Sequence, residues 1–246
     1  MRTVLFTALV ALAMSGAAHA AKDASSAIKV DTTWNVSLDA DGHVVDLKQS
    51  TQVKPLLSEP LARAIRSWVF EPGRVDGRPA ATETTLQVGV TLEPNASNGY
   101  VVRVDHVNTG GGIAKTLAPT FPVSVLRRES DTFSALAVVQ VHYDAAGKVI
   151  GAEVAPGAPE VDRAVSDAAL KSVRHWTFQP ERVGGHALAS SAYVPICFTL
   201  TRDRRAPAAD CASWTPPGAS TTVANGGSLA LEPAATLKSD VIGRTL

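Results

Sequence analysis

The sequence predicts an α+β protein of two tandem β-β-α-β units, each a small antiparallel sheet packed on one helix. A strand–turn–strand pattern with an Asp-x-x-Gly turn occurs at Asp39–Gly42 and again at Asp144–Gly147, which is typical of β-hairpins. Each hairpin is followed by a stretch of helical periodicity that ends in the motif Trp-x-Phe-x-Pro, at Trp68 and at Trp176. The change of period from strand to helix indicates the β-β-α order.

The two units recur at a nearly constant spacing. Val36 corresponds to Val141 at an offset of 105 residues, and Trp68 to Trp176 at an offset of 108. This period exceeds that of solenoid repeats and is typical of a duplicated domain, with a small insertion in the second copy. The chain divides accordingly into a signal peptide (1–20), a first copy (30–94), a linker that could hold one extra strand (95–118), a second copy (119–201) and a mostly disordered tail rich in Pro, Ala and Ser (202–246).

The hairpin strands come first in each unit. They are predicted at 34–38 and 44–47 in the first copy, and at 136–143 and 149–154 in the second, where β-branched and apolar residues predominate. The turn glycines, Gly42 and Gly147, suit the positive φ of a tight hairpin.

The helix of each unit is predicted from apolar residues at helical spacing. Pro60 is placed to open the first helix, because a proline in the first turn loses no hydrogen bond. A further short helix is expected at 123–128, in the lead-in to the second copy. The apolar faces consist of Leu61, Ala64, Ile65 and Trp68 in the first copy and of Val165, Ala169, Val173 and Trp176 in the second.

The helix leads into a joint and a last strand. A proline moves the residue before it out of the helical region, so the phenylalanine of Trp-x-Phe-x-Pro can point back into the core. The last strands alternate, and this alternation turns Cys197 away from the core, free to reach Cys211. In an exported protein such a pair is expected to form a disulfide. The predicted core residues of the joint are Trp68, Phe70, Pro72, Trp176, Phe178 and Pro180.

The first residues indicate export. Arg2 precedes an apolar run, Val4–Met14, and the sequence Ala18-His19-Ala20 follows, which is typical of a secretory signal peptide cleaved after Ala20. The run is shorter than the roughly 20 residues that a membrane span requires, so no span is expected after cleavage. Retention of the leader as an anchor is the alternative.

Composition and motifs narrow the function. Twenty-three Lys and Arg balance 23 Asp and Glu, whereas a nucleic-acid-binding protein normally carries a basic excess. The sequence contains no G-x-S-x-G or H-E-x-x-H motif, and the triplet 110–112 indicates a flexible linker rather than a phosphate loop. We therefore predict no catalytic residue, metal, cofactor or nucleic-acid partner.

The ordered set of motifs is similar to the C-terminal domain of TonB-type energy transducers. The second copy resembles it more closely, with Pro119–Pro122 like the family's Pro-x-Tyr-Pro, then Asp144–Val149 and Ala168–Pro180. In that family the domain lies in the periplasm and binds an extended segment of outer-membrane receptors, which adds as a strand to the sheet edge. The long Pro-rich spacer of the full transducers is absent between Ala21 and Val36.

The resemblance implies that the last strands are the peptide-binding edges. Pro195 would blunt the second edge because proline lacks an N–H. The first edge would then be the more competent, unless pairing with the second copy consumes it. The implied edge residues are Thr85, Leu86, Gln87, Val88, Gly89 and Val90 in the first copy and Tyr193, Val194, Ile196 and Phe198 in the second.

These observations predict a soluble periplasmic protein-binding or scaffolding module of a Gram-negative host. Its partner would be a protein or peptide of the periplasm or outer membrane, bound by strand addition. Two alternatives remain open: a membrane-anchored TonB-type transducer for outer-membrane receptor transport, and a periplasmic enzyme with an unrecognised site.

Overall fold

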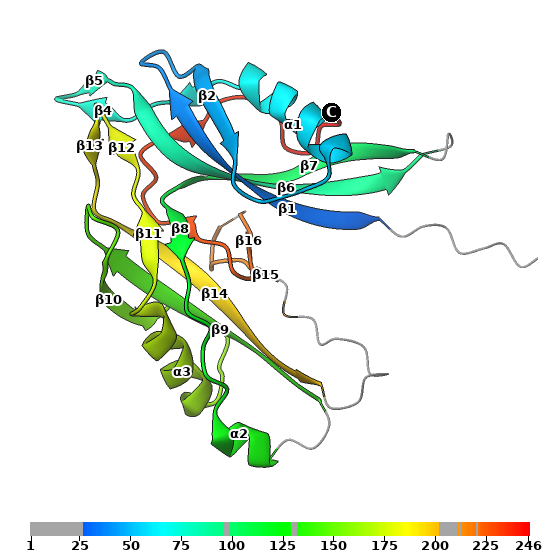
Figure 1. Cartoon of the computed structure of the whole chain (residues 1–246), viewed down its shortest axis with the longest axis vertical. Coiled ribbons are helices and arrows are strands. Elements are labelled where there is room, and N and C mark those ends of the chain that lie inside the picture. The colour runs from blue at the N-terminus through cyan, green and yellow to red at the C-terminus, as the bar shows by residue number, and fades with distance from the viewer. Residues whose placement is uncertain (1–26, 96–98, 129–131, 202–210, 212, 220) are drawn as a thin grey trace, which may run out of the picture.

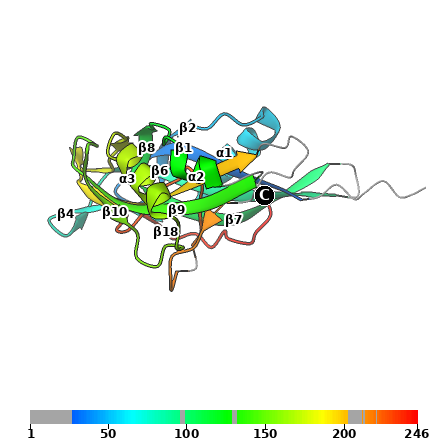
Figure 2. The same ribbon diagram turned by 90° about the horizontal axis from the view of Figure 1, so that it is seen from below.

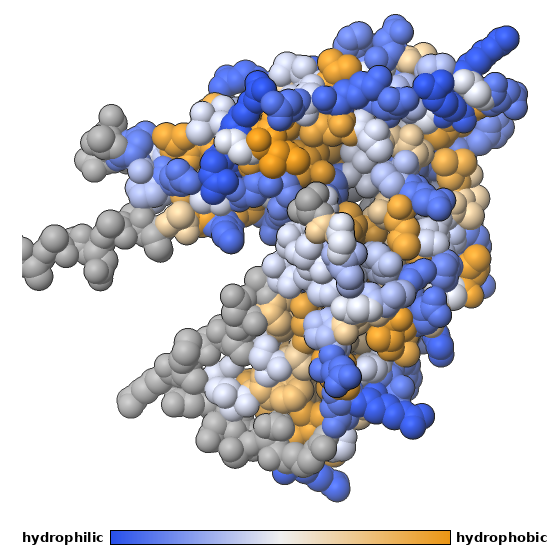
Figure 3. Space-filling view, turned by 180° about the vertical axis from the view of Figure 1, so that it is seen from behind, coloured by the Kyte–Doolittle hydropathy of each residue, from blue (hydrophilic) through white to orange (hydrophobic). Residues whose placement is uncertain are grey.

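The computed structural model describes residues 27–95, 99–128, 132–201, 211, 213–219 and 221–246. The predicted α+β class is confirmed, since antiparallel strands predominate and the helices are few. Two arms diverge from one side of the molecule (Figure 1). The space-filling view from behind shows the open notch between them (Figure 3).

The first arm contains a sheet of strand order β13-β12-β6-β1-β2, with β7 also paired to β6. Helix α1 (Pro55–Ser67) covers one face, and Trp34, Val36 and Leu86 are buried beneath it. The strands are β1 (Ile28–Leu38), β2 (Val44–Gln49), β6 (Thr82–Pro94), β7 (Tyr100–Gly110), β12 (Arg182–Val183) and β13 (His186–Ala187).

Helix α1 begins one turn earlier than predicted. Pro55 lies in its first turn, and Pro60 is inside the helix rather than at its start. Leu57 thereby joins the buried face together with the predicted Leu61 and Ile65. At position 60 the proline leaves the Leu56 carbonyl without a helical N–H donor, yet the helix continues to Ser67.

The second arm contains a sheet of strand order β10-β9-β14-β17. Helix α3 (Arg163–Val173) packs on one face, and Asp162 caps it by accepting a hydrogen bond from the Ala164 N–H. Phe121, from the Pro-x-Phe-Pro segment, contacts the ring of Phe198 edge-on, and the predicted short helix α2 (Val123–Arg128) follows that segment. The strands are β9 (Thr132–Tyr143), β10 (Val149–Val154), β14 (Ser190–Thr201) and β17 (Leu229–Ala230).

The Trp-x-Phe-x-Pro joints lie in the two cores as predicted. Trp68, Phe70, Trp176 and Phe178 are all buried. Pro72 is buried too, whereas Pro180 is only half-buried. The joints include the short strands β3 (Phe70–Glu71) and β11 (Thr177–Gln179). A hairpin follows each joint: β4 (Arg74–Val75) pairs with β5 (Arg78–Pro79) after the first, and β12 pairs with β13 after the second.

The glycine triplet is a tightly packed crossing between the arms, not a flexible linker. All three glycines are buried, and Gly112 begins strand β8 (Gly112–Lys115), which pairs with β11. A Cβ on Gly111 would lie 2.1 Å from the Tyr143 hydroxyl oxygen, and one on Gly110 would lie 2.3 Å from the Ala230 Cβ. The chain can cross here only because these residues have no side chain.

The tail is folded over its described residues, contrary to the prediction of disorder. Trp214 and Val223 are buried against the face of the second sheet that lies opposite α3. Ala230 is buried at the edge of this sheet, where it pairs with Ala192. Disorder was predicted because the tail sequence has little periodicity. Its strands are too short to produce a periodic pattern, and they are ordered by packing on existing sheets. They are β15 (Ser213–Trp214), β16 (Val223–Ala224), β17 and β18 (Thr236–Leu237). In the view from below, the β15–β16 hairpin projects on the side away from α1 (Figure 2).

The predicted disulfide joins Cys197 of β14 to Cys211 of the tail. It closes a loop with a sequence separation of 14 residues. Reduction is expected to lower the free energy of unfolding by about 2–3 kcal/mol, because the open loop gains entropy in the unfolded chain. Urea unfolding with and without reductant checks this, and the double variant Cys197→Ser/Cys211→Ser should not respond to reductant. Equal unfolding midpoints for the oxidised and reduced protein would contradict the prediction.

The predicted signal peptide lies outside the described residues. Among the residues that the structure does describe, no helix has the length and apolar character needed to cross a membrane.

Candidate functional site

The predicted peptide-binding edge of the first copy is closed on both sides. β1 pairs with β6 from Leu38↔Thr82 to Ile28↔Leu92, and β7 pairs with its other side from Thr85 to Pro94. The predicted edge at Thr85–Val90 is therefore wrong: β6 is an inner strand. The linker supplies the partner because an antiparallel neighbour reached by a short connection readily pairs with the open edge.

Pairing with the second copy accounts for only the start of β6. There β12 pairs with Thr82 and Glu83. The second copy thus takes part in closing this edge, as the alternative prediction foresaw, but the linker strand β7 closes most of it.

The predicted edge of the second copy is covered by the tail. Tyr193 pairs with Leu229 of β17, and the Cys197 N–H donates to the Asn225 side chain at 2.9 Å. The Pro195 carbonyl accepts from the Gly226 N–H, so the backbone groups of this buried residue point away from β9 toward the tail, and its lack of an N–H breaks no bond to β9. Val194, Ile196 and Phe198 are buried in the core of the second arm.

The outer edge of β7 is occupied by residues 243–246. The Gly243 N–H donates to the Val104 carbonyl at 2.7 Å, and the Val104 N–H donates to the Arg244 carbonyl at 3.0 Å. The Leu246 N–H donates to the Val102 carbonyl at 2.9 Å. The edge Val102–Val104 can therefore accept an extended segment as an added strand.

The outer strands β2 and β10 carry matching β-bulges. Their ladders shift register at Val45 and Ile150, two side chains that are 65% and 66% exposed. Bulges disrupt the regular spacing of edge hydrogen bonds and so protect edges from pairing. Neither strand has a second ladder partner within the described part of the chain.

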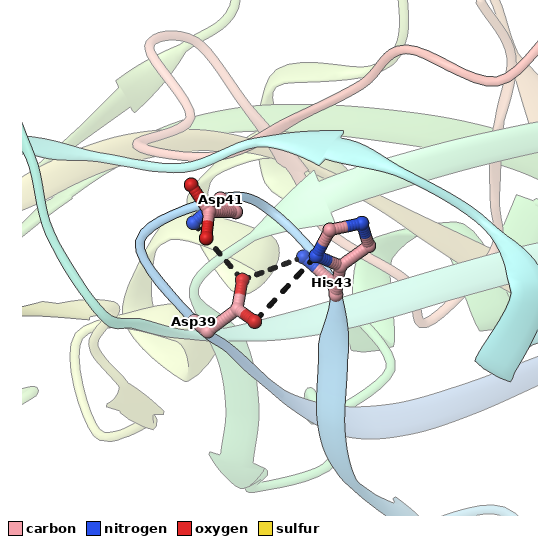
Figure 4. Close-up of side chains that lie close together, drawn as sticks. All are labelled: Asp39, Asp41 and His43. Atoms are coloured by element: carbon pink, nitrogen blue, oxygen red, sulfur yellow. Dashed lines mark hydrogen bonds and ion pairs between the residues drawn. The ribbon is translucent and has the colours of Figure 1, made fainter.

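Asp39, Asp41 and His43 lie close enough together to suggest a cation site (Figure 4). The Asp39 carboxylate already accepts hydrogen bonds from the Asp41 and His43 N–H groups at 3.0 and 2.8 Å, and the bond from His43 lowers the pKa of Asp39. In the second hairpin Asp144 makes the same two bonds, to Ala146 and Lys148. The second hairpin makes these bonds without a second acid or a histidine, so the role of the aspartate in both hairpins is to stabilise the turn rather than to bind a cation.

A Ser–His–Glu arrangement crosses the second sheet. Ser191 Oγ lies 2.7 Å from His142 Nδ1, and Glu153 Oε1 lies 3.9 Å from Nε2. A separation of 3.9 Å is not a hydrogen bond, so the exposed Glu153 does not orient the imidazole as the acid of a catalytic triad does. The sequence did not suggest this group, because Ser191 and His142 meet only through the register of β14 on β9.

Glu181 lies buried where the two arms and the tail meet. It is 3% exposed; its carboxylate accepts from the Thr84 hydroxyl and from the Ala234 N–H, each at 2.7 Å. Burial raises the pKa of Glu181, and the hydrogen bonds from Ala234 and Thr84 partly oppose this shift. No sequence motif points to Glu181; the one signal is the repeat offset of 108, which aligns it with Gly73 and so marks a charged residue in place of a glycine.

A comparison of the chain with known protein families, with curated proteins and with solved structures finds no match.

Proposed function

We propose that this protein is a periplasmic, non-enzymatic protein-binding or scaffolding module that binds extended peptide segments by strand addition. The observation that carries the proposal is the outer edge of β7, where backbone hydrogen bonds and an isolated β-bridge at Thr245 hold residues 243–246. Backbone bonding of this kind tolerates many sequences, which suits a binding surface for extended segments.

We propose further that the two arms derive from one TonB C-terminal-like β-β-α-β unit. Three features support this: the ladders β2-β1-β6 and β10-β9-β14 follow the same order, both hairpins carry an Asp-capped turn, and both joints place a tryptophan and a phenylalanine in the core. In this duplicated form the edges implied by the resemblance, on β6 and β14, are already paired. The linker strand β7 instead provides the edge to which a peptide strand adds.

The partner would be a protein of the periplasm or outer membrane. The anchored-transducer alternative differs in keeping residues 1–20 in the mature protein, and an intact-mass measurement separates the two. A mature chain that begins at Ala21 would exclude the anchor.

Photo-crosslinking in living cells tests the binding edge. With p-benzoylphenylalanine in place of Tyr100, at the start of β7, we expect an adduct with a discrete partner, mapped by mass spectrometry to an extended segment of it. The matched control carries the same crosslinker at Val45, exposed on the bulged strand β2. No adduct at Tyr100, or the same adducts at both positions, would refute the proposal.

A further inference from the structure

We infer that residues 240–246 are an intramolecular ligand of the β7 edge, which a partner peptide must displace in order to bind. This inference rests on the proposed function and adds its regulation: the binding edge is closed by the chain itself.

The closing segment uses the backbone groups that a partner would need. It satisfies the carbonyl of Val102 and both the N–H and the carbonyl of Val104. Thr245 lies opposite Arg103 as a non-hydrogen-bonded pair, so its N–H points away from β7. An incoming strand cannot bond to the same groups while residues 243–246 occupy them.

The segment is held mainly by these backbone bonds. Val241 packs against the core of the first arm, but Ile242 and Leu246 remain 57% and 41% exposed. Gly243 has a φ of +79° and no atom within 4 Å of the position of a Cβ, so no side-chain packing holds the turn there. Apart from Val241, the apolar side chains of the segment are exposed, so its departure uncovers little buried area.

The tether makes the segment an effective competitor even if its own affinity is weak. A ligand joined by a short connection acts at an effective concentration on the order of millimolar. A partner must therefore bind more tightly than this segment, or be present at high local concentration. It must also be extended and carry free N–H groups at alternate residues.

The test uses a fluorescent heptapeptide with the sequence of residues 240–246. Fluorescence anisotropy compares its binding to the full-length chain and to a chain that ends at Ser239. We expect the truncated chain to bind at least tenfold more tightly, because its edge is open. N-methylation of the peptide at Leu246 should abolish binding, whereas N-methylation at Thr245, whose N–H is outside the ladder, should not.

A second variant guards against loss of folding in the truncated chain. Leu246→Pro in the full-length chain removes a single N–H from the ladder and should also raise heptapeptide binding. Equal binding by the three chains, or binding insensitive to methylation at Leu246, would overturn the inference. The crosslinking experiment at Tyr100 tests whether a partner binds this edge, whereas the heptapeptide experiment tests whether residues 240–246 close it, so the two can fail independently.

Discussion

Replacing Gly147 by alanine is expected to lower the free energy of unfolding by about 4 kcal/mol. Gly147 has a φ of +79°, and a Cβ there would lie 1.9 Å from the Phe178 carbonyl oxygen. Alanine would therefore add backbone strain, push the joint away and weaken the hydrogen bond from the Phe178 N–H to the Gly147 carbonyl. Urea unfolding of the purified variant measures the loss.

Gly185→Ala is the matched control. Its φ of +83° is almost the same, but no atom lies within 4 Å of the added Cβ. Only the left-handed strain remains, so the expected loss is about 1 kcal/mol. Equal losses at Gly147 and Gly185 would show that the approach of the joint to the hairpin does not matter.

Two substitutions of Glu181 are expected to distinguish the contribution of its hydrogen bonds to the free energy of unfolding from the contribution of its charge. Glu181→Ala leaves the Thr84 hydroxyl and the Ala234 N–H without their acceptor, and we expect a loss of about 3 kcal/mol. In Glu181→Gln the amide oxygen can accept from Ala234 while the NH₂ group donates to Thr84, so stability at pH 7 should change by less than about 1 kcal/mol. Urea unfolding of both variants checks this.

The pH dependence has a defined sign. Because burial raises the pKa of Glu181 above its ordinary value of 4.5, the folded state holds this proton more tightly than the unfolded state does. Its stabilising effect is complete below pH 4.5 and is lost as the pH rises through the raised pKa. The wild type should therefore lose stability relative to Glu181→Gln as the pH rises above 4.5, with Glu160→Gln, at an exposed position, as control. Parallel pH profiles for wild type and Glu181→Gln would contradict this.

Local features of the fold could be predicted because short stretches of sequence determine them. The turn glycines Gly42 and Gly147 have the expected positive φ, and the helix residues Ile65 and Val173 are fully buried. The tail could not be predicted in this way. Strands as short as β17 have no periodicity of their own, and their order comes from the sheets against which they lie.

The candidate site escaped prediction for a similar reason. The resemblance placed the binding edge on β6 and β14, and it gave no information about β7, which lies in the linker between the copies. Whether a strand is an edge depends on every other segment that can reach it. The packed glycine triplet shows the same limit, since a Gly-rich stretch in a flexible linker and one in a crowded crossing look alike in the sequence.

The first sheet is completed by segments that are far apart in the chain. β6 gains β12 about a hundred residues after its own start, and β7 gains its outer neighbour only from residues 243–246. Such long-range pairings slow folding. During synthesis the start of β6 and the outer side of β7 therefore lack these partners until residues 182–183 and 243–246 emerge, and open strand edges favour aggregation in that interval.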